Sequence, residues 1–169
     1  SGYAVDTSDL SSGNRMTLTY TDTTTGTSKT VTFVKVTDSS SLPLSDSATL
    51  DPNDTVVGID FSGGAASVAS QIQAALGSSF SVSNTTGDTI QILDDGSGSV
   101  SVDGLSKTVT TTGTQTGSAS LPLFTDGSSV YTGSFDGTSQ LTGLASRIKV
   151  NSAVSADPTL LVDYSSTTE

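Results

Sequence analysis

The fold is decided by residues 63–93, which read GGAASVASQIQAALGSSFSVSNTTGDTIQIL. The first half of this stretch combines apolar residues at helical spacing with several alanines, which are strong helix formers. Glycines flank it at the positions where a helix cap and a left-handed terminal residue are favoured. We therefore predict a helix over about 65–76. Its apolar face carries Val68, Ile72, Ala75 and Leu76.

The second half of the same stretch changes to a period of two, which is typical of β-strands. Phe80 and Val82 alternate with serines, and Ile90 and Ile92 alternate with other polar residues. Between these two runs, residues 84–88 read NTTGD, which is turn-forming chemistry. The pattern predicts a β-hairpin directly after the helix.

A helix this short is marginal in water, so it needs a sheet against which to bury its apolar face. Each large aliphatic side chain buried there contributes roughly 1.5–3 kcal/mol. The predicted fold class is α+β and β-rich, with a small antiparallel sheet of about five strands covered by one helix and a less regular C-terminal part. The strands are expected at 16–20, 30–36, 55–61, 80–84 and 89–93.

The strand expected over 30–36 has apolar residues on both sides of its pleat. Val31 and Phe33 point to one face, whereas Val34 and Val36 point to the other, because successive side chains alternate. A turn rich in Thr and Gly joins this strand to the preceding one. The two strands are therefore expected to pair as an antiparallel hairpin.

Outside these elements the pattern is weaker. Residues 1–14 show no clear period. Residues 100–102 are interpreted as a short strand that ends in a turn at 103–104, where the dipeptide is Asp-Gly. Residues 107–112 are rich in β-branched side chains and are expected to form an edge strand.

We divide the chain into an outer α+β domain at 1–120 and a C-terminal return segment at 121–169 that packs on it. Within this segment, residues 141–148 fit a short helical turn, although Ile148 and Val150 fit equally well the start of a strand. We expect Ile148 and Val150 to be covered by the body of the domain.

Charge and composition exclude several kinds of partner. The 169 residues include 17 acidic and 6 basic ones, which gives a formal net charge of −11. No stretch could neutralise a run of phosphates, which excludes a nucleic-acid partner, and docking on an anionic membrane surface is disfavoured. No apolar run approaches the length of a transmembrane helix. Because the chain has no Cys, it has neither disulfides nor thiolate metal sites.

The residue inventory also leaves little room for catalysis. Without His or Cys, the chain has no Ser-His-Asp triad, no Cys-His pair and no imidazole metal site. We therefore expect no enzyme activity, no catalytic or cofactor-binding residues, no cofactor and no metal ligands. Two acidic stretches, 51–54 and 94–95, are interpreted as turns. The first lacks the central Gly and late Glu of an EF-hand, and adjacent carboxylates in the second cannot face each other across a cleft.

Several stretches carry a resemblance to a known family. The helix and hairpin over 68–93 are similar to a unit in the outer domains of bacterial flagellins and hook-associated proteins. Residues 143–151, GLASRIKVN, followed by DPTLLV at 157–162, look like the A-x-R-I-x-V-N … D-P-x-x-L segment of the flagellar hook-associated protein 1 family, the hook–filament junction proteins. The stretches LPLFTDG at 121–127 and YTG at 131–133 resemble the same family.

This resemblance implies a structural, non-catalytic protein of the bacterial flagellum that is exported through the flagellar secretion channel and functions outside the cell. It implies contacts with the hook protein, with the second junction protein and with further copies of the same protein, and an export chaperone for the full-length chain. Members of the family carry long terminal heptad helices that build the inner tube. No heptad pattern occurs here, so we expect this chain to be an outer portion of such a protein.

We expect the isolated chain to be a monomer. Its net charge of −11 opposes self-association at low salt. Its apolar residues are mostly assigned to the helix and strand faces above, which leaves no large exposed patch.

Two alternatives remain open. One is an extracellular adhesin or another β-rich module that binds calcium or glycans, and the other is a domain of a flagellin-type filament subunit. A flagellar axial protein should have amphipathic heptad helices on both sides of this segment. An adhesin should instead show repeats of the module or a wall anchor, and no internal repeat is visible in this sequence.

Overall fold

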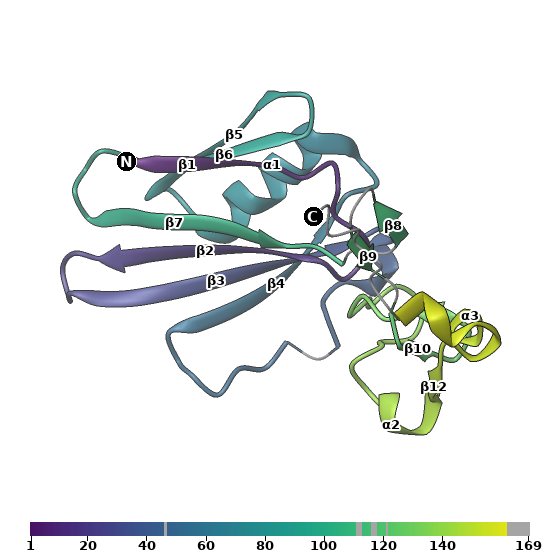
Figure 1. Ribbon diagram of the computed structural model, residues 1–169. Helices are drawn as coiled ribbons and strands as arrows, with labels where there is room; N and C mark the ends of the chain where they lie inside the picture. The colour runs from purple at the N-terminus through teal and green to yellow at the C-terminus, as the bar shows by residue number, and fades with distance from the viewer. Residues whose placement is uncertain (46, 111–112, 116–117, 121, 162–169) are drawn as a thin grey trace, which may run out of the picture.

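The computed structural model describes residues 1–45, 47–110, 113–115, 118–120 and 122–161. Its class is α+β and β-rich, as predicted. Residues 1–110 form a body of two sheets and one long helix, and residues 122–161 form an arm that projects from one end of this body (Figure 1). Within the described ranges, no helix is long and apolar enough to cross a membrane.

The predicted helix is present as α1 (Gly64–Leu76). Val68 and Ile72 are buried at 1% and 0% exposure, and Leu76 is partly buried against the same core. Ala75 is exposed and Ala69 is buried instead, because the centre of the buried face lies near Ile72 rather than near Val68. The helix ends at a glycine with a φ of 79°, as the sequence predicts.

The helix packs on a three-stranded antiparallel sheet and on an edge strand of the second sheet. The predicted hairpin forms the strands β5 (Phe80–Thr86) and β6 (Thr89–Asp94) of the first sheet. Its third strand is β1 (Gly2–Asp6), which pairs antiparallel with β6. Residues 1–14, which show no clear period in the sequence, therefore include a strand. Its Val5 packs against the main core, whereas Tyr3 is 46% exposed.

The second sheet has the strand order β4-β3-β2-β7. Strands β2 (Arg15–Asp22) and β3 (Thr27–Val36) form the predicted antiparallel hairpin. Strand β4 (Asp54–Asp60) pairs parallel with β3, so the expectation of one antiparallel sheet is wrong at this point. The long connection from 37 to 53, which includes the short helix η1 (Ser39–Ser41), returns the chain to the end of the sheet where β3 began.

Strand β7 (Val100–Thr108) combines the short strand predicted at 100–102 with the start of the edge strand predicted at 107–112, and it does lie at an edge of the sheet. The turn predicted between them at 103–104 is wrong, and residues 111–112 lie outside the described residues. Strand β7 pairs with β2 along its whole length, with a register shift where Thr19 faces Gly104 and Tyr20 faces Val102. Asp103 is the extra residue on the β7 side of this shift. The Asp-Gly dipeptide therefore marks a bulge rather than a turn, since both features use a residue that tolerates irregular backbone.

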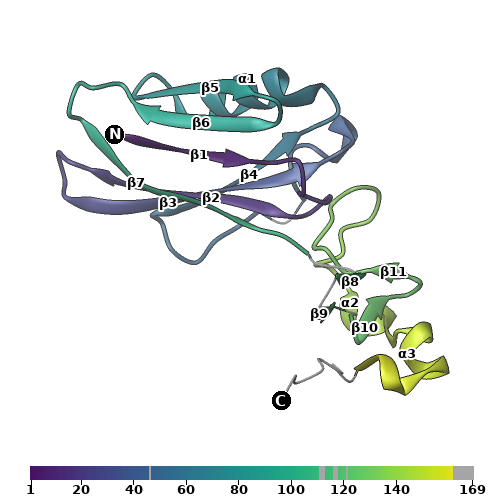
Figure 2. The same ribbon diagram turned by 45° about the horizontal axis from the view of Figure 1, so that its top comes forward.

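The two sheets meet where β1 and β7 run side by side (Figures 1 and 2), and α1 closes the main core. Val31 and Phe33 of β3 are buried in this main core. Val34 and Val36 face the opposite side and belong to a smaller second core, as the alternation of the strand predicts. The main core is built from the body alone: Leu10, Met16, Leu18, Val31, Phe33, Ile59, Val68, Ala69, Ile72, Phe80, Ile90, Ile92 and Val102.

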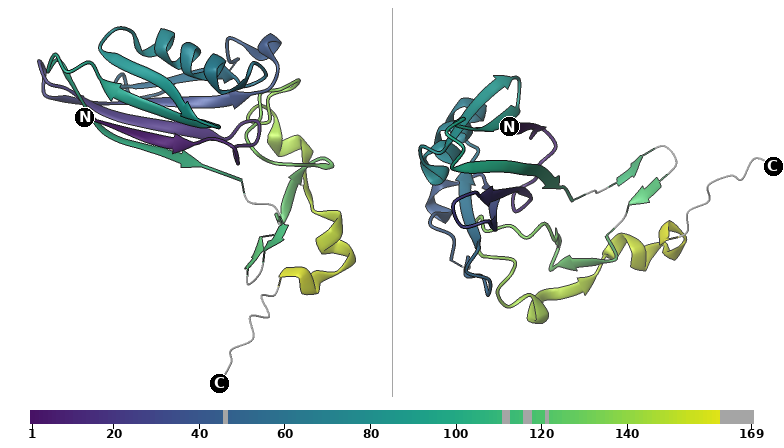
Figure 3. Two further views of the ribbon diagram at one scale, coloured as in Figure 1. Left: turned by 90° about the horizontal axis from the view of Figure 1, so that it is seen from above. Right: turned by 90° about the vertical axis from the view of Figure 1, so that its left-hand side faces the viewer.

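The arm extends away from the body in both views of Figure 3. It contains a small sheet with the order β11-β10-β12 and several short helices. A separate two-stranded hairpin of β8 (Gly113–Gln115) and β9 (Ser118–Ser120) precedes it. The elements of the arm are β10 (Phe124–Asp126), β11 (Ser129–Val130), α2 (Leu144–Arg147), β12 (Ile148–Val150), α3 (Ser152–Ala156) and η2 (Pro158–Leu161).

Both interpretations of residues 141–150 are partly right, because α2 ends at Arg147 and β12 begins at the next residue. The expectation that Ile148 and Val150 are covered by the body is wrong, because their side chains are 46% and 50% exposed. Strand β12 lies at the edge of the small sheet of the arm, away from the body (Figures 1 and 3).

Candidate functional site

The acidic stretches singled out in the sequence form turns, as predicted. The carboxylate of Asp51 accepts a hydrogen bond from the backbone N–H of Asn53 at 2.9 Å. The carboxylate of Asp95 accepts one from the N–H of Ser97 at 2.9 Å, and hydrogen bonds from Ser97 lower the pKa of Asp95. In the described part of the chain, no group of three His, Cys, Asp or Glu side chains is placed to hold a metal ion.

The most elaborate polar arrangement lies where the arm meets the body, around residues 133–136, which we call the plug. Phe135 of the plug is only 4% exposed. Its ring belongs to the second core, against Val34 and Val36 of β3 and against Leu44. The arm therefore supplies part of the cover for the outer face of the four-stranded sheet.

The carboxylate of Asp136 anchors the plug to three segments of the body. It accepts hydrogen bonds from the backbone N–H of Thr37 at 3.0 Å and from its hydroxyl at 2.6 Å. It also accepts bonds from the Ser12 hydroxyl at 2.5 Å, the Ser41 hydroxyl at 3.2 Å and the Asp38 N–H at 3.3 Å. Burial alone raises the pKa of Asp136. The hydrogen bonds from Ser12, Thr37 and Ser41 together lower this pKa by more than burial raises it, so the net shift is downward.

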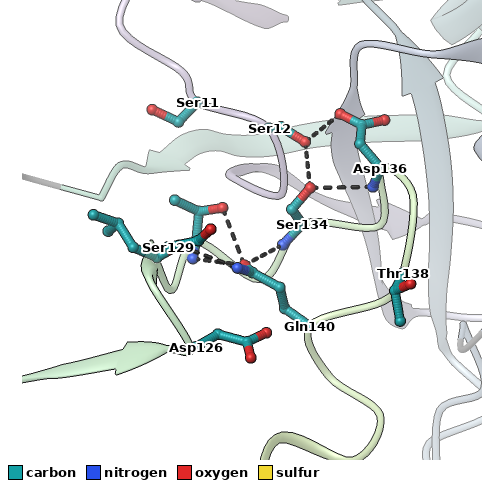
Figure 4. Close-up of a pocket in the computed structure, with 10 residues that line it drawn as sticks. Ser11, Ser12, Asp126, Ser129, Ser134, Asp136, Thr138 and Gln140 are labelled. Carbon is teal, nitrogen blue, oxygen red and sulfur yellow. Dashed lines mark hydrogen bonds between the residues drawn. The ribbon is translucent and has the colours of Figure 1, made fainter. Parts of the chain in front are cut away.

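The backbones of the body and the plug also touch directly. A Cβ atom added to Gly13 would lie 2.3 Å from the carbonyl carbon of Gly133, and Gly13 has a φ of 86°. The hydroxyls of Ser12 and Ser134 are hydrogen-bonded at 2.7 Å (Figure 4). Only glycine fits at position 13, because any side chain there would collide with the plug and strain its own backbone.

Gln140 holds the shape of the plug from within the arm. Its side-chain oxygen accepts hydrogen bonds from the N–H groups of Thr132 and Ser134 at 3.0 and 3.1 Å. Its side-chain nitrogen donates to the carbonyl of Val130 at 3.1 Å. Gln140 is 9% exposed, and these bonds satisfy its amide in both directions.

The small sheet of the arm is tied together by an ion pair. The Arg147 guanidinium binds both carboxylate oxygens of Asp126, at 2.7 and 3.1 Å. This pairing lowers the pKa of Asp126 and raises that of Arg147. Asn151 adds a second link, because its side-chain nitrogen donates to the carbonyl of Pro122 at 2.9 Å.

A polar hollow of about 490 Å³ lies beside the plug, and its lining includes Ser12, Ser134, Asp136 and Gln140 (Figure 4). Hydroxyl, amide and carboxylate groups line it, but no imidazole, thiol or amine does. The polar side-chain atoms of both Asp136 and Gln140 already take part in hydrogen bonds, those of Asp136 with the body and those of Gln140 within the arm. Across the described ranges, every buried side-chain nitrogen and oxygen has a hydrogen-bond partner, so the hollow presents no buried polar atom that awaits a ligand.

The sequence analysis did not predict that Asp136 and the pair Gly13 and Gly133 lie where the arm meets the body, or that Gln140 supports the plug. Asp136 precedes a glycine, and an Asp-Gly dipeptide is an ordinary turn signal. The signal that was present is a run of turn-forming residues containing a single Phe, since an apolar side chain isolated in a loop often anchors that loop to a core.

The arm also carries an exposed apolar patch, which contradicts the expectation that the apolar residues are used up in the core. Its exposed fractions are 40% for Leu123, 53% for Phe124, 37% for Tyr131, 46% for Ile148 and 50% for Val150. A groove of about 330 Å³ runs through the patch beside Leu144. These residues are exposed because the arm is too thin to have two layers that could cover them.

No known protein family, curated protein or solved structure matches this chain.

Proposed function

We propose that this chain is an outer domain of a hook–filament junction protein of the bacterial flagellum, with a structural and not a catalytic role. One observation carries the proposal. The two stretches that resemble this family, 121–127 and 143–151, are separate in sequence but pair with each other in β10 and β12. In this pairing Phe124 lies opposite Val150, and Asp126 lies opposite Ile148.

The residues that carry the resemblance also make the contacts that hold the arm together. Arg147, the Arg of the A-x-R-I-x-V-N pattern, binds Asp126 of the other stretch through two nitrogens. Asn151, which ends the pattern, caps α3 by accepting from the N–H of Ala153 at 3.0 Å and binds the carbonyl of Pro122. Shared contacts of this kind support a resemblance based on one structural unit rather than on two chance similarities.

The proposed location is outside the cell, after export through the flagellar secretion channel. The proposed partners are the hook protein, the second junction protein and other copies of the same protein, with an export chaperone for the full-length chain. The exposed patch on the arm gives such contacts an apolar surface, while the acidic body, part of a chain with a net charge of −11, remains in solvent.

The alternative classes have less support. A module that binds glycans commonly combines aromatic faces with polar groups, but the polar hollow has no aromatic ring in its lining. The exposed Phe124 and Tyr131 line a separate groove whose other residues are mostly aliphatic. An enzyme would need a nucleophile beside a base, and a chain without His or Cys lacks the commonest bases and thiol nucleophiles.

The test is localisation in the source bacterium. An antibody raised against the purified chain should label the junction between hook and filament in immunogold electron microscopy. Deletion of the gene should leave hooks in place but prevent stable filaments. Label spread over the cell envelope would favour an adhesin. Label along whole filaments would favour a filament subunit, and normal filaments in the deletion strain would contradict both flagellar proposals.

A further inference from the structure

The contacts between the arm and the body are concentrated in the plug. Within the described ranges, every hydrogen bond between residues 1–110 and 122–161 ends on Ser134 or Asp136. The ion pairs of the described residues lie within the body or within the arm, and none joins the two. The apolar contact extends slightly beyond the plug, because Phe135 and the partly buried Leu141 are the arm residues that join a core of the body.

The body does not depend on this link for its main core. All the buried residues of the main core, and the partly buried ones packed against them, come from residues 5–109. The arm likewise has its own internal contacts, through the Arg147–Asp126 pair and through Asn151. The plug, together with Leu141, is therefore the main contact between two parts that are each held together separately.

We propose that the plug is a latch that fixes the orientation of the arm on the body. The latch combines one apolar anchor, Phe135, with one charged anchor, Asp136, at adjacent positions. Neither anchor alone fixes an angle, but the ring enters the second core while the carboxylate is held by Ser12, Thr37 and Ser41. The close approach of the backbones at Gly13 and Gly133 also restricts any translation of the plug along the surface of the body.

Loss of the Phe135 and Asp136 contacts would have two consequences. The arm, with its exposed patch around Phe124 and Ile148, would no longer point in one direction relative to the body. The outer face of β3, with Val34 and Val36, would lose the cover that Phe135 provides. The latch is thus a conformational device that determines where the patch is presented, and it does not depend on the function proposed above.

The chain contains no Cys, so spin labels can be placed at two chosen sites without a background. We would attach them at Thr24→Cys, in the exposed β2–β3 turn of the body, and at Ser155→Cys, on the exposed side of α3 in the arm. Pulsed electron paramagnetic resonance on the labelled chain should give a single narrow distance distribution. With Phe135→Ala and Asp136→Ala added, the narrow peak should be lost and a broad distribution should replace it.

The matched control is Phe124→Ala with Asp51→Ala, which removes the same two side-chain types at exposed positions outside the latch. This control should keep the narrow peak, and circular dichroism should show both variants folded. If the double latch variant fails to fold, the nearly isosteric Asp136→Asn provides the same comparison, with a broadened distribution expected. A broad distribution in the unmodified latch, or a narrow one in every folded latch variant, would overturn the proposal.

A second measurement uses the contact between Ser12 and Ser134, whose hydroxyl oxygens are 2.7 Å apart. The pair Ser12→Cys and Ser134→Cys should be oxidised rapidly by added diamide, which takes up the two hydrogens, to an internal disulfide that mass spectrometry detects as a loss of two hydrogens. Adding Phe135→Ala should slow this oxidation, because the two thiols then meet less often. Oxidation at an unchanged rate would mean that Phe135 does not hold the latch closed, and would contradict the proposal.

Discussion

At the scale of single residues, side chains of the same type contribute differently to the stability of the body and of the arm. Ile72 is 0% exposed in α1, whereas Ile148 is 46% exposed in the arm. The stabilisation from a side chain follows the apolar area that it removes from water, so the contributions of these two isoleucines should differ about two-fold from burial alone. Their contrast provides a test of the core that is independent of any function.

Ile72→Ala should lower the free energy of unfolding by about 2–5 kcal/mol, because it leaves a cavity between α1 and the sheets. Ile148→Ala should lower it by only about 1 kcal/mol or less, because this side chain is half-exposed and its removal leaves no enclosed cavity. Urea denaturation followed by circular dichroism measures both. Equal effects of the two substitutions would show that α1 does not lie on the core as described.

Asp136 should make the stability of the chain depend on pH in one direction. Its pKa in the folded chain lies below the ordinary value of 3.8. Its contribution to stability is therefore fully present above that ordinary value and is lost as the pH falls through the lower, folded pKa. The difference in free energy of unfolding between the wild type and Asp136→Asn should be constant near neutral pH and should shrink towards zero in acid.

The measurement is urea unfolding of both proteins from about pH 7 to about pH 2.5. Asp88→Asn serves as the control, since it removes the same charge at an exposed position whose side chain makes no hydrogen bond with the plug. A difference between wild type and Asp136→Asn that grows in acid would show that the carboxylate is not the stabilising form.

At the scale of elements, the structure separates turn signals that look alike in sequence. The Asp-Gly dipeptide at 103–104 lies in a continuous strand, at the register shift of β7. The acidic stretch at 94–98 begins at the last residue of β6 and bends the chain, and Asp94 and Asp95 accept hydrogen bonds from the backbone N–H groups two residues further on. The difference is set by β2, which lies beside β7 and extends its pairing through the irregular site.

The acidic turns are predicted to be structural and not metal sites. Asp51, Asp94 and Asp95 direct carboxylate oxygens at the N–H groups of their own turns. Calcium titration should therefore raise the melting temperature no more than magnesium does at equal ionic strength, because only general screening acts. Differential scanning calorimetry measures this. A saturable rise with calcium alone, at sub-millimolar concentration, would instead favour the adhesin alternative.

At the scale of the whole molecule, an acidic body of two sheets carries a thin arm with an exposed apolar patch (Figures 1 and 3). We still expect the isolated chain to be a monomer at micromolar concentration. A stable interface usually involves about 20–30 residues on each side, and the patch has far fewer. The net charge of −11 also opposes association at low salt.

Analytical ultracentrifugation at low and high salt tests this expectation. The sedimentation coefficient should correspond to 16.9 kDa in both conditions. Ile148→Asp, which places a charge in the patch, should leave it unchanged. A dimer at both salt concentrations that Ile148→Asp disrupts would identify the patch as a self-association surface.

The sequence by itself determined the elements whose residues repeat with a local period. The helix at α1, the β2–β3 and β5–β6 hairpins, β4 and the two faces of β3 follow from apolar spacing and turn residues. Such patterns arise because one face of each element must leave water, and that requirement is written within a few consecutive residues.

Only the tertiary structure decided how these elements combine and where the arm attaches to the body. The parallel pairing of β4, the strand at β1 and the latch at Phe135 and Asp136 each depend on a partner remote in the chain. Asp136, for example, is held by Ser12 and Thr37, and nothing in the residues around it reveals either donor. A contact between distant residues costs chain entropy and is selected by the whole fold, so no local period records it.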